Sequence, residues 1–303
     1  MTRVAVVLFG PRGEGGFNEC GAAGAERARA HAPGLEIVWC EPPADRAACV
    51  RDLARQGYAL IVAHGGQGDA PVASVAPDFP ATAFVVTQGS QPAANVACYD
   101  AQQEHSAYLA GVLAALETRT GVVAHMSGER VRPGLKGRAA FADGVARTRP
   151  GVRLLTTFCG DQHDPDLAYR VVAAQARAGA DILFAMIDGG RAGALRAGSE
   201  FGVRHIGNVF DWTVREPASC IASAVADSGE CIARAVRDHA AGALRMGTVV
   251  HIGSEAPEVV RLAMGAAIGA DTRAVIAAAA QQLAEGRIRP AAEYTGREFE
   301  FAA

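Results

Sequence analysis

Apolar and polar positions alternate in blocks along this chain. Short runs rich in Val, Ile, Leu and Phe are bounded by Gly, Pro and Asn, and stretches rich in Ala and charged residues separate them. Such runs are typical of parallel strands that are buried on both faces and connected by helices. The pattern therefore predicts an α/β protein with Rossmann-like parallel sheets.

The alternation runs through two series. In the first, the expected strands are 4–9, 35–40, 59–63, 82–87 and 95–99, and the expected helices are 18–31, 46–56, 70–76 and 103–118. In the second, the expected strands are 121–125, 152–157, 181–186 and 205–210, and the expected helices are 135–147, 166–178 and 192–201. Two series predict two lobes, with a ligand cleft between the carboxyl edges of their strands.

Composition excludes several classes of function. The chain has 303 residues, 50% of them apolar, and a formal net charge of −3. It lacks the clustered Lys and Arg of a nucleic-acid-binding surface, and its apolar runs are too short to span a bilayer. The seven cysteines form no C-x-x-C pair and are odd in number, as is usual in a reducing compartment. We expect a cytoplasmic protein as the sequence stands, or a periplasmic or lipid-anchored one if a signal segment was removed.

The glycine-rich turn after the first strand is not a nucleotide-phosphate loop. Asn18 stands where a dinucleotide fingerprint needs its third glycine, and Gly16-Phe17 stands where a P-loop needs Lys-Ser/Thr. Asn18 is instead expected to be a helix N-cap, with nearby amides that favour an acceptor group of a ligand. Phe17 either projects into the cleft, where its ring would stack on a planar ligand, or fills the core.

Five stretches of the chain together resemble a known family. They are Gly15-Gly16-Phe17-Asn18, Gln56–Ile61 before His64-Gly65, Asn95-Val96-Ala97 before Tyr108–Gly111, His163-Asp164-Pro165, and Gly179–Phe184 before Asp188-Gly189. In this order and spacing they resemble the basic membrane protein (BMP) family of solute-binding proteins, best known as purine nucleoside receptors of ABC transporters. The resemblance implies a type I periplasmic-binding-protein fold with a three-segment hinge. By analogy, lobe 1 comprises 1–121 plus 219–245, and lobe 2 comprises 122–218 plus 246–303.

The resemblance also implies the function and a set of ligand contacts. The expected function is the capture of a small planar polar ligand, a purine base or nucleoside-like molecule, between the lobes. No cofactor or metal is expected, and an ABC permease is the expected partner if a signal segment was removed. The implied ligand-binding residues are Phe17, Asn18, His64, Asp100, Gln102, Met186, Asp188, Gly189 and Asp211.

Two positions depart from the pattern of nucleoside-binding relatives. Asp211 matches a residue that holds ribose hydroxyls, but Ala226 stands where its lysine partner is expected. Gln102 stands where relatives carry an acidic residue that reads a purine edge, although a shift of two in the alignment gives that role to Asp100. The identity of the ring edge that is recognised therefore stays open.

A cytoplasmic enzyme or ligand sensor on the same fold is the alternative. The dipole of the opening helix is expected to lower the pKa of Cys20, with Glu19 and His64 as orienting acid and base for hydrolysis of a heterocycle. A simpler interpretation makes Cys20 a packing residue and His64 a hydrogen-bonding group of the cleft. A metal site would need distant residues at strand ends, such as His64, His125 and Asp188. The basic segment 126–136 is expected to be a solvated loop, with binding of an anionic ligand as its alternative.

Overall fold

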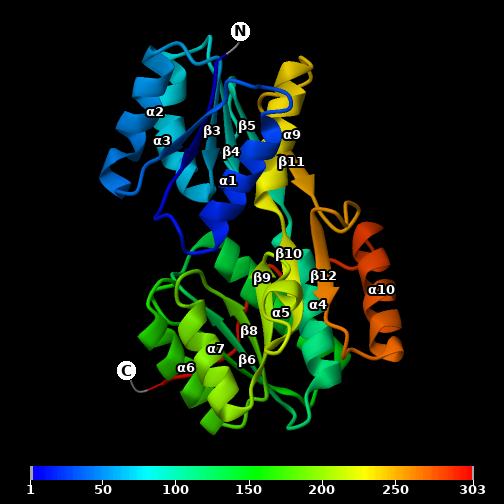
Figure 1. Cartoon of the computed structure of the whole chain (residues 1–303). Helices are drawn as coiled ribbons and strands as arrows, with labels where there is room; N and C mark the ends of the chain where they lie inside the picture. Colours follow the sequence, from blue (N-terminus) through cyan, green and yellow to red (C-terminus); the bar gives the residue numbers. More distant parts are fainter. Residues whose placement is uncertain (1–2, 302–303) are drawn as a thin grey trace. The chain divides into compact units, whose positions relative to one another are not determined.

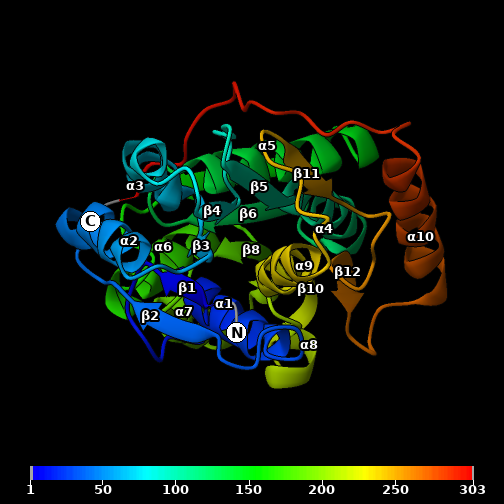
Figure 2. The same cartoon turned by 90° about the horizontal axis from the view of Figure 1, so that it is seen from above.

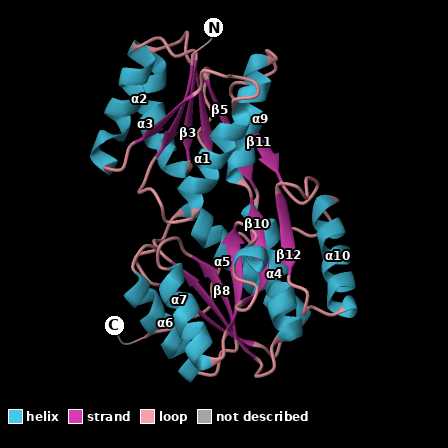
Figure 3. Ribbon diagram, in the orientation of Figure 1, coloured by secondary structure: helices cyan, strands magenta, loops and turns pink. Residues whose placement is uncertain are grey.

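The computed structural model describes residues 3–301, which form two compact units. Within the described residues, unit 1 comprises 3–101 and 227–252, and unit 2 comprises 102–226 and 253–301. Strands and helices alternate in both units (Figure 1, Figure 3). The chain passes between the units three times, after Ala101, Ala226 and Ile252.

Unit 1 is built on a six-stranded parallel sheet with the order β11-β5-β4-β3-β1-β2. Its strands are β1 (Val4–Leu8), β2 (Glu36–Trp39), β3 (Leu60–His64), β4 (Ala83–Thr87), β5 (Val96–Ala101) and β11 (Val249–Ile252). Its helices are α1 (Phe17–Ala28), α2 (Arg46–Arg55), α3 (Asp69–Val75) and α9 (Ser228–Ala240), with 3₁₀ turns at Pro43–Asp45, Gly66–Gly68 and Ala76–Asp78.

Burial along the strands of unit 1 follows their place in the sheet. The central strands β1 and β3 are buried at every position, whereas the edge strand β2 is partly exposed throughout. Helices α1 and α9 cover one face of this sheet, and α2 and α3 cover the other (Figure 1). Burial on both faces explains why the central strands are continuous apolar runs rather than alternating ones.

Unit 2 contains a second six-stranded sheet with the order β12-β10-β9-β8-β6-β7. Its strands are β6 (Val122–Ser127), β7 (Arg153–Phe158), β8 (Ile182–Met186), β9 (Arg204–Val209), β10 (Cys220–Ala226) and β12 (Val260–Met264). Its helices are α4 (Gln103–Glu117), α5 (Arg132–Thr148), α6 (Pro165–Arg177), α7 (Arg191–Phe201), α8 (Trp212–Arg215) and α10 (Ala270–Ala284).

Helices α4 and α5 cross closely on one face of the unit 2 sheet. A Cβ atom at Gly111 would lie 2.2 Å from the Phe141 carbonyl oxygen, and one at Gly144 would lie 2.2 Å from that of Tyr108. Such distances leave no room for a side chain, so two glycines allow the backbones to approach. The opposite face of the sheet carries α6 and α7, while α10 packs on α4 and β12.

The C-terminal tail after α10 crosses unit 2 and passes α5 (Figure 2). The Ala291 amide donates to Asp143 of α5 over 3.1 Å, and the Phe299 amide donates to the Thr156 carbonyl of β7 over 2.7 Å. Glu298 in the tail accepts from the buried Arg138 side chain. The tail therefore pairs with part of the exposed edge of the sheet and neutralises a buried cation.

The α/β fold with parallel-dominated sheets is confirmed, with one difference. Strand β12 pairs antiparallel with β10, so the second sheet is mixed rather than wholly parallel. The boundary of the units also differs from the expected 121/122, because α4 packs on α5 and β10 of unit 2. The later boundaries fall at 226/227 and 252/253, where we expected 218/219 and 245/246.

Candidate functional site

In unit 1, the carboxyl ends of the parallel strands gather several of the predicted site residues. Phe17 follows β1, and His64 is the last residue of β3, which pairs with Leu8. The Phe17 and His64 rings stack with centroids 4.2 Å apart and an interplanar angle of 18°. The two residues therefore form one aromatic platform, in which His64 is fully buried and Phe17 is half-buried.

His64 is fixed by hydrogen bonds on both ring nitrogens. Its Nε2 lies 3.1 Å from the Phe17 carbonyl oxygen, and its Nδ1 lies 2.9 Å from Thr87 Oγ1. The side chain is fully buried, and this burial lowers the pKa of His64 to about 4. At neutral pH the ring is uncharged and acts as a support for Phe17.

The helix after the glycine turn begins one residue earlier than expected. Gly16, not Asn18, is the N-cap of α1, and Glu19 reaches back to accept from the Gly16 amide over 3.1 Å. The other Glu19 oxygen accepts from the Gly13 amide over 2.5 Å. The prediction of Asn18 as N-cap was wrong, because the capping contact is made from within the helix, where Glu19 lies three residues after Gly16 and accepts from its amide.

Asn18 is buried against the turn that precedes it. Its side chain is 9% exposed, and a Cβ atom at Gly10 would lie 2.4 Å from its Nδ2 atom. Its Oδ1 atom is buried and has no hydrogen-bond partner among the described residues. An acceptor in this state favours a ligand that supplies an N–H or O–H group.

The expected thiolate at Cys20 is contradicted by the structure. Burial, followed by the negative charge of Asp227, raises the pKa of Cys20 to about 12. The thiol lies 3.2 Å from Asp227 Oδ1 and is 2% exposed. Glu19 is engaged by backbone amides and His64 by Phe17 and Thr87, so the three residues do not form a nucleophile, base and orienting acid.

Asp100 and Gln102 lie on either side of the first passage between the units. Asp100 lies in β5, is 1% exposed, and its Oδ2 atom is 3.6 Å from His251 Nδ1 of β11. Gln102 belongs to unit 2 and directly precedes α4. Asp100 and Gln102, the two alternatives for the residue that recognises the edge of a purine ring, therefore belong to different units.

In unit 2, the predicted residues follow strands β8 and β9. Met186 ends β8, and half-buried Asp188 and Gly189 lead into α7. Asp211 follows β9 and is the N-cap of α8, with its Oδ1 accepting from the Thr213 amide over 3.0 Å and from Thr213 Oγ1 over 2.5 Å. Val209, two residues before it, has φ of +67°, a strained value for a β-branched residue.

Sequence reasoning missed Arg191, the first residue of α7. Its guanidinium lies 4.2 Å from the Trp212 ring centroid and donates to the Ile187 carbonyl and to Asn208. Burial lowers the pKa of Arg191 to about 10, while the nearby Asp188 opposes that change. The sequence feature that could have identified Arg191 is its place directly after Asp188-Gly189-Gly190, as a charged residue at the start of an Ala-rich helix.

The basic segment 126–136 is not a solvated loop over its whole length. Helix α5 begins at Arg132, and Lys136 pairs with Glu104 of α4 over 2.5 Å. Their side chains are 22% and 13% exposed. Sequence reasoning missed Glu104, because only the packing of two helices brings it to Lys136.

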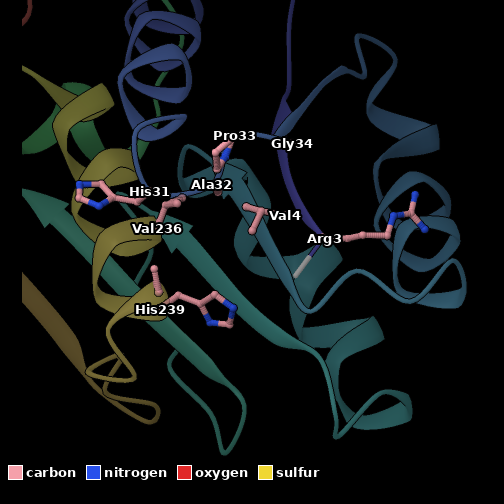
Figure 4. Close-up of a pocket in the computed structure, with 9 residues that line it drawn as sticks. Arg3, Val4, His31, Ala32, Pro33, Gly34, Val236 and His239 are labelled. Atoms are coloured by element: carbon pink, nitrogen blue, oxygen red, sulfur yellow. The ribbon is translucent and has the colours of Figure 1, made fainter. Parts of the chain in front are cut away.

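A metal site has no support in the described part of the chain. Across residues 3–301, no group of three or more His, Cys, Asp or Glu side chains is arranged to hold a metal ion. A cavity of about 340 Å³ lies at the amino end of β1, lined in part by His31 and His239 (Figure 4). The Arg3 side chain extends away from both histidines in this view, and no predicted site residue lines the cavity.

Comparison with protein families gives a match over most of the chain. The family model described as "ABC transporter substrate-binding protein PnrA-like" matches residues 1–267. A purine-binding protein of Brucella abortus (strain 2308) is 23% identical over 231 residues, which cover 75% of this chain and 65% of that protein. The match thus spans less than two thirds of the length of this curated relative.

Solved structures share the fold along nearly the whole chain. A solute-binding protein of an ABC transporter system from Aeropyrum pernix K1 superposes with a TM-score of 0.84 at 20% identity, covering 95% of this chain and 93% of the other. A solute-binding protein from Conexibacter woesei DSM 14684 gives a TM-score of 0.74 at 22% identity, covering 97% and 100%. None of the helices in residues 3–301 is both long and apolar enough to cross a membrane.

Proposed function

Because the chain belongs to the family of PnrA-like ABC transporter substrate-binding proteins, we propose that it binds a small, planar, polar ligand of the purine kind. The binding groups are those at the carboxyl edges of the strands, where open α/β sheets hold their ligands. We assign Phe17 and Asn18 of unit 1 and Met186 and Asp188 of unit 2 to ligand contact. An ABC permease is the partner that family membership suggests.

The stack of Phe17 on His64 is the observation that carries this proposal. The His64 ring is held by hydrogen bonds at both nitrogens, so it supports Phe17 in one orientation. Flat heterocycles pack well on such a surface, since aromatic pairs favour offset stacking at centroid distances of about 4.5–7 Å. The unpartnered Oδ1 of Asn18, one residue along, supplies an acceptor for a ring N–H.

A free base fits the residues of unit 2 better than a nucleoside does. The name of the Brucella relative supports purine as the ligand class. Asp211 already uses its Oδ1 atom to cap α8 and to hold the Thr213 hydroxyl. Ala226 offers no polar group at the end of β10. Ribose hydroxyls would therefore have to share Asp211 with the cap of α8 and would gain no second charged partner at position 226.

Isothermal titration calorimetry with hypoxanthine, guanine, adenine, inosine and D-ribose tests this proposal. We expect a free base to bind, inosine to bind more weakly and ribose not to bind. Phe17→Ala is expected to weaken binding of the base by about 10- to 100-fold, because the aromatic platform is lost. Phe17→Tyr keeps the ring and serves as the matched control. Equal affinities for the wild type and Phe17→Ala would refute the assignment of Phe17.

A further inference from the structure

Lys136 is the only lysine in the chain, and the other 28 of its 29 basic residues are arginines. Its Nζ atom lies 2.5 Å from Glu104 Oε1, with side chains 22% and 13% exposed. The basic side chain of this pair is less exposed than that of a surface ion pair such as Arg147–Asp143, in which the arginine is 53% exposed. A compact ammonium group thus lies, largely buried, against the Glu104 carboxylate.

The fold brings this pair to the carboxyl edge of the unit 2 sheet. Thr118, the residue directly after α4, donates to Asp181 at the amino end of β8, so the C-terminal end of α4 lies at the amino edge of the sheet. Helix α4 has 15 residues and is about 22 Å long, so its first turn lies at the opposite, carboxyl edge. Glu104 lies in that first turn. Lys136 lies in the first turns of α5, which directly follows β6. Helices α4 and α5 pack closely on one another, and this packing sets the two side chains side by side.

The pair also adjoins a residue assigned to ligand contact. Gly137 follows Lys136 in α5, and a Cβ atom there would lie 2.5 Å from the Met186 sulfur. Helix α5 therefore rests on the end of β8, the strand that leads to Asp188. The charged pair and the polar residues after β8 belong to the same edge of the same unit.

One oxygen of the pair is left without a partner. Glu104 Oε2 is buried and has no hydrogen-bond partner among residues 3–301, and the same holds for the nearby Gln103 Nε2 and Ser254 Oγ. His105 of α4 accepts from the Ser254 amide over 3.2 Å, and Glu255 accepts from the Gly253 amide over 2.6 Å. A buried carboxylate oxygen without a donor is costly, so a ligand donor at this point would stabilise the bound state.

We propose that Glu104 and Lys136 form the polar recognition pair of unit 2 and select a cyclic amide edge. This inference rests on the proposed function and names the ligand class more closely. The ring N–H of the ligand donates to Glu104 Oε2, and Lys136 donates to the adjacent carbonyl oxygen. The paired charges cancel, so the ligand is a neutral oxo-substituted heterocycle, and a carboxylate would be repelled by Glu104.

Binding of hypoxanthine and of unsubstituted purine, measured by calorimetry, tests the proposal. Hypoxanthine carries a ring carbonyl with an N–H beside it in its six-membered ring, whereas purine lacks this cyclic amide and keeps only the N–H of its five-membered ring. We expect the wild type to bind hypoxanthine about 10- to 100-fold more tightly than purine, because purine leaves the pair unsatisfied. Lys136→Met and Glu104→Gln should abolish that preference, whereas Arg147→Gln, which breaks the exposed pair on the same helix, should preserve it.

Amine labelling gives a second readout that does not depend on the variants. Reductive methylation has two amine targets, Lys136 and the chain's amino terminus. Hypoxanthine is expected to slow labelling of Lys136 and to leave the terminal amine unchanged. If the wild type binds bases without preferring hypoxanthine, or if Lys136 is not protected, this inference is overturned while the proposed function stands. If no base binds at all, both are overturned.

Discussion

At the scale of single residues, the acidic side chains beside the sheets fall into two groups, according to whether their oxygens already accept hydrogen bonds from the protein. Asp211 and Glu19 accept from backbone amides near helix starts, and Asp227 accepts from the Glu230 amide and from Arg27. Glu104 differs, because one of its oxygens is buried and has no hydrogen-bond partner within residues 3–301. Of these four residues, sequence reasoning proposed only Asp211 as a ligand group, and the hydrogen bonds of the structure are what distinguish the helix caps from Glu104.

Cys20 shows why a local argument failed. Its place in the first turn of α1 predicts a lowered pKa, because the helix dipole stabilises a thiolate. Asp227 comes from a segment 207 residues along the chain and lies against the sulfur. Burial and this carboxylate together outweigh the dipole. Neither effect can be predicted from the residues around Cys20.

The thiol of Cys20 is therefore expected to be unreactive in the folded protein. At pH 8, a thiol with a pKa of about 12 is almost wholly protonated, and only the thiolate attacks alkylating agents. Iodoacetamide labelling followed by peptide mapping should modify Cys20 far more slowly in native protein than in guanidinium-unfolded protein. Rapid native labelling, or loss of a hydrolytic activity in Cys20→Ala, would revive the enzyme alternative.

At the scale of elements, the sequence predicted the strands and helices up to β9 closely, and several later ones not at all. The strands that are buried on both faces, such as β1 and β3, stand out as apolar runs. Strand β11 is four residues long and partly exposed, and its pairing with β5 comes from a distant part of the chain. The antiparallel pairing of β12 depends equally on tertiary contact, which a local pattern does not carry.

The crossing of α4 and α5 gives a prediction at this scale. Gly111→Ala places a Cβ atom 2.2 Å from a backbone carbonyl, so the helices must move apart. We expect the free energy of unfolding to fall by about 1–3 kcal/mol despite the better helix propensity of Ala. Urea denaturation measures it. Gly151→Ala, where nothing lies within 4 Å, is the control and should change stability little.

At the scale of the whole molecule, three buried histidines link stability to pH. Burial lowers the pKa of His64 to about 4, of His125 to about 3 and of His205 to about 4, from 6.5. The folded state holds these rings neutral, while the unfolded chain binds protons as the pH falls below 6.5. Their contribution to stability is therefore complete above about pH 6.5 and is lost as the pH falls toward 3–4.

Urea denaturation at pH 7.5, 6.0 and 5.0 tests this linkage. Each histidine is expected to reduce the free energy of unfolding by up to about 1.4 kcal/mol per pH unit within that window. His125→Gln removes one titrating group, so its stability should fall less steeply between pH 6.5 and 5 than that of the wild type. A stability that stays constant from pH 7.5 to 5.0 would contradict the assignment of neutral buried rings.

The three passages of the chain between the units also bear on how the protein is made. Residues 1–101 leave the ribosome without β11 and α9, which arrive only with residues 227–252. At about 5–20 residues per second, this gap lasts roughly 8–30 s. During that time β5 has an unpaired edge, and a face of the first sheet lacks one of its covering helices. An open strand edge readily pairs with other chains, so the synthesis of unit 2 is the interval in which the nascent protein is most exposed to aggregation.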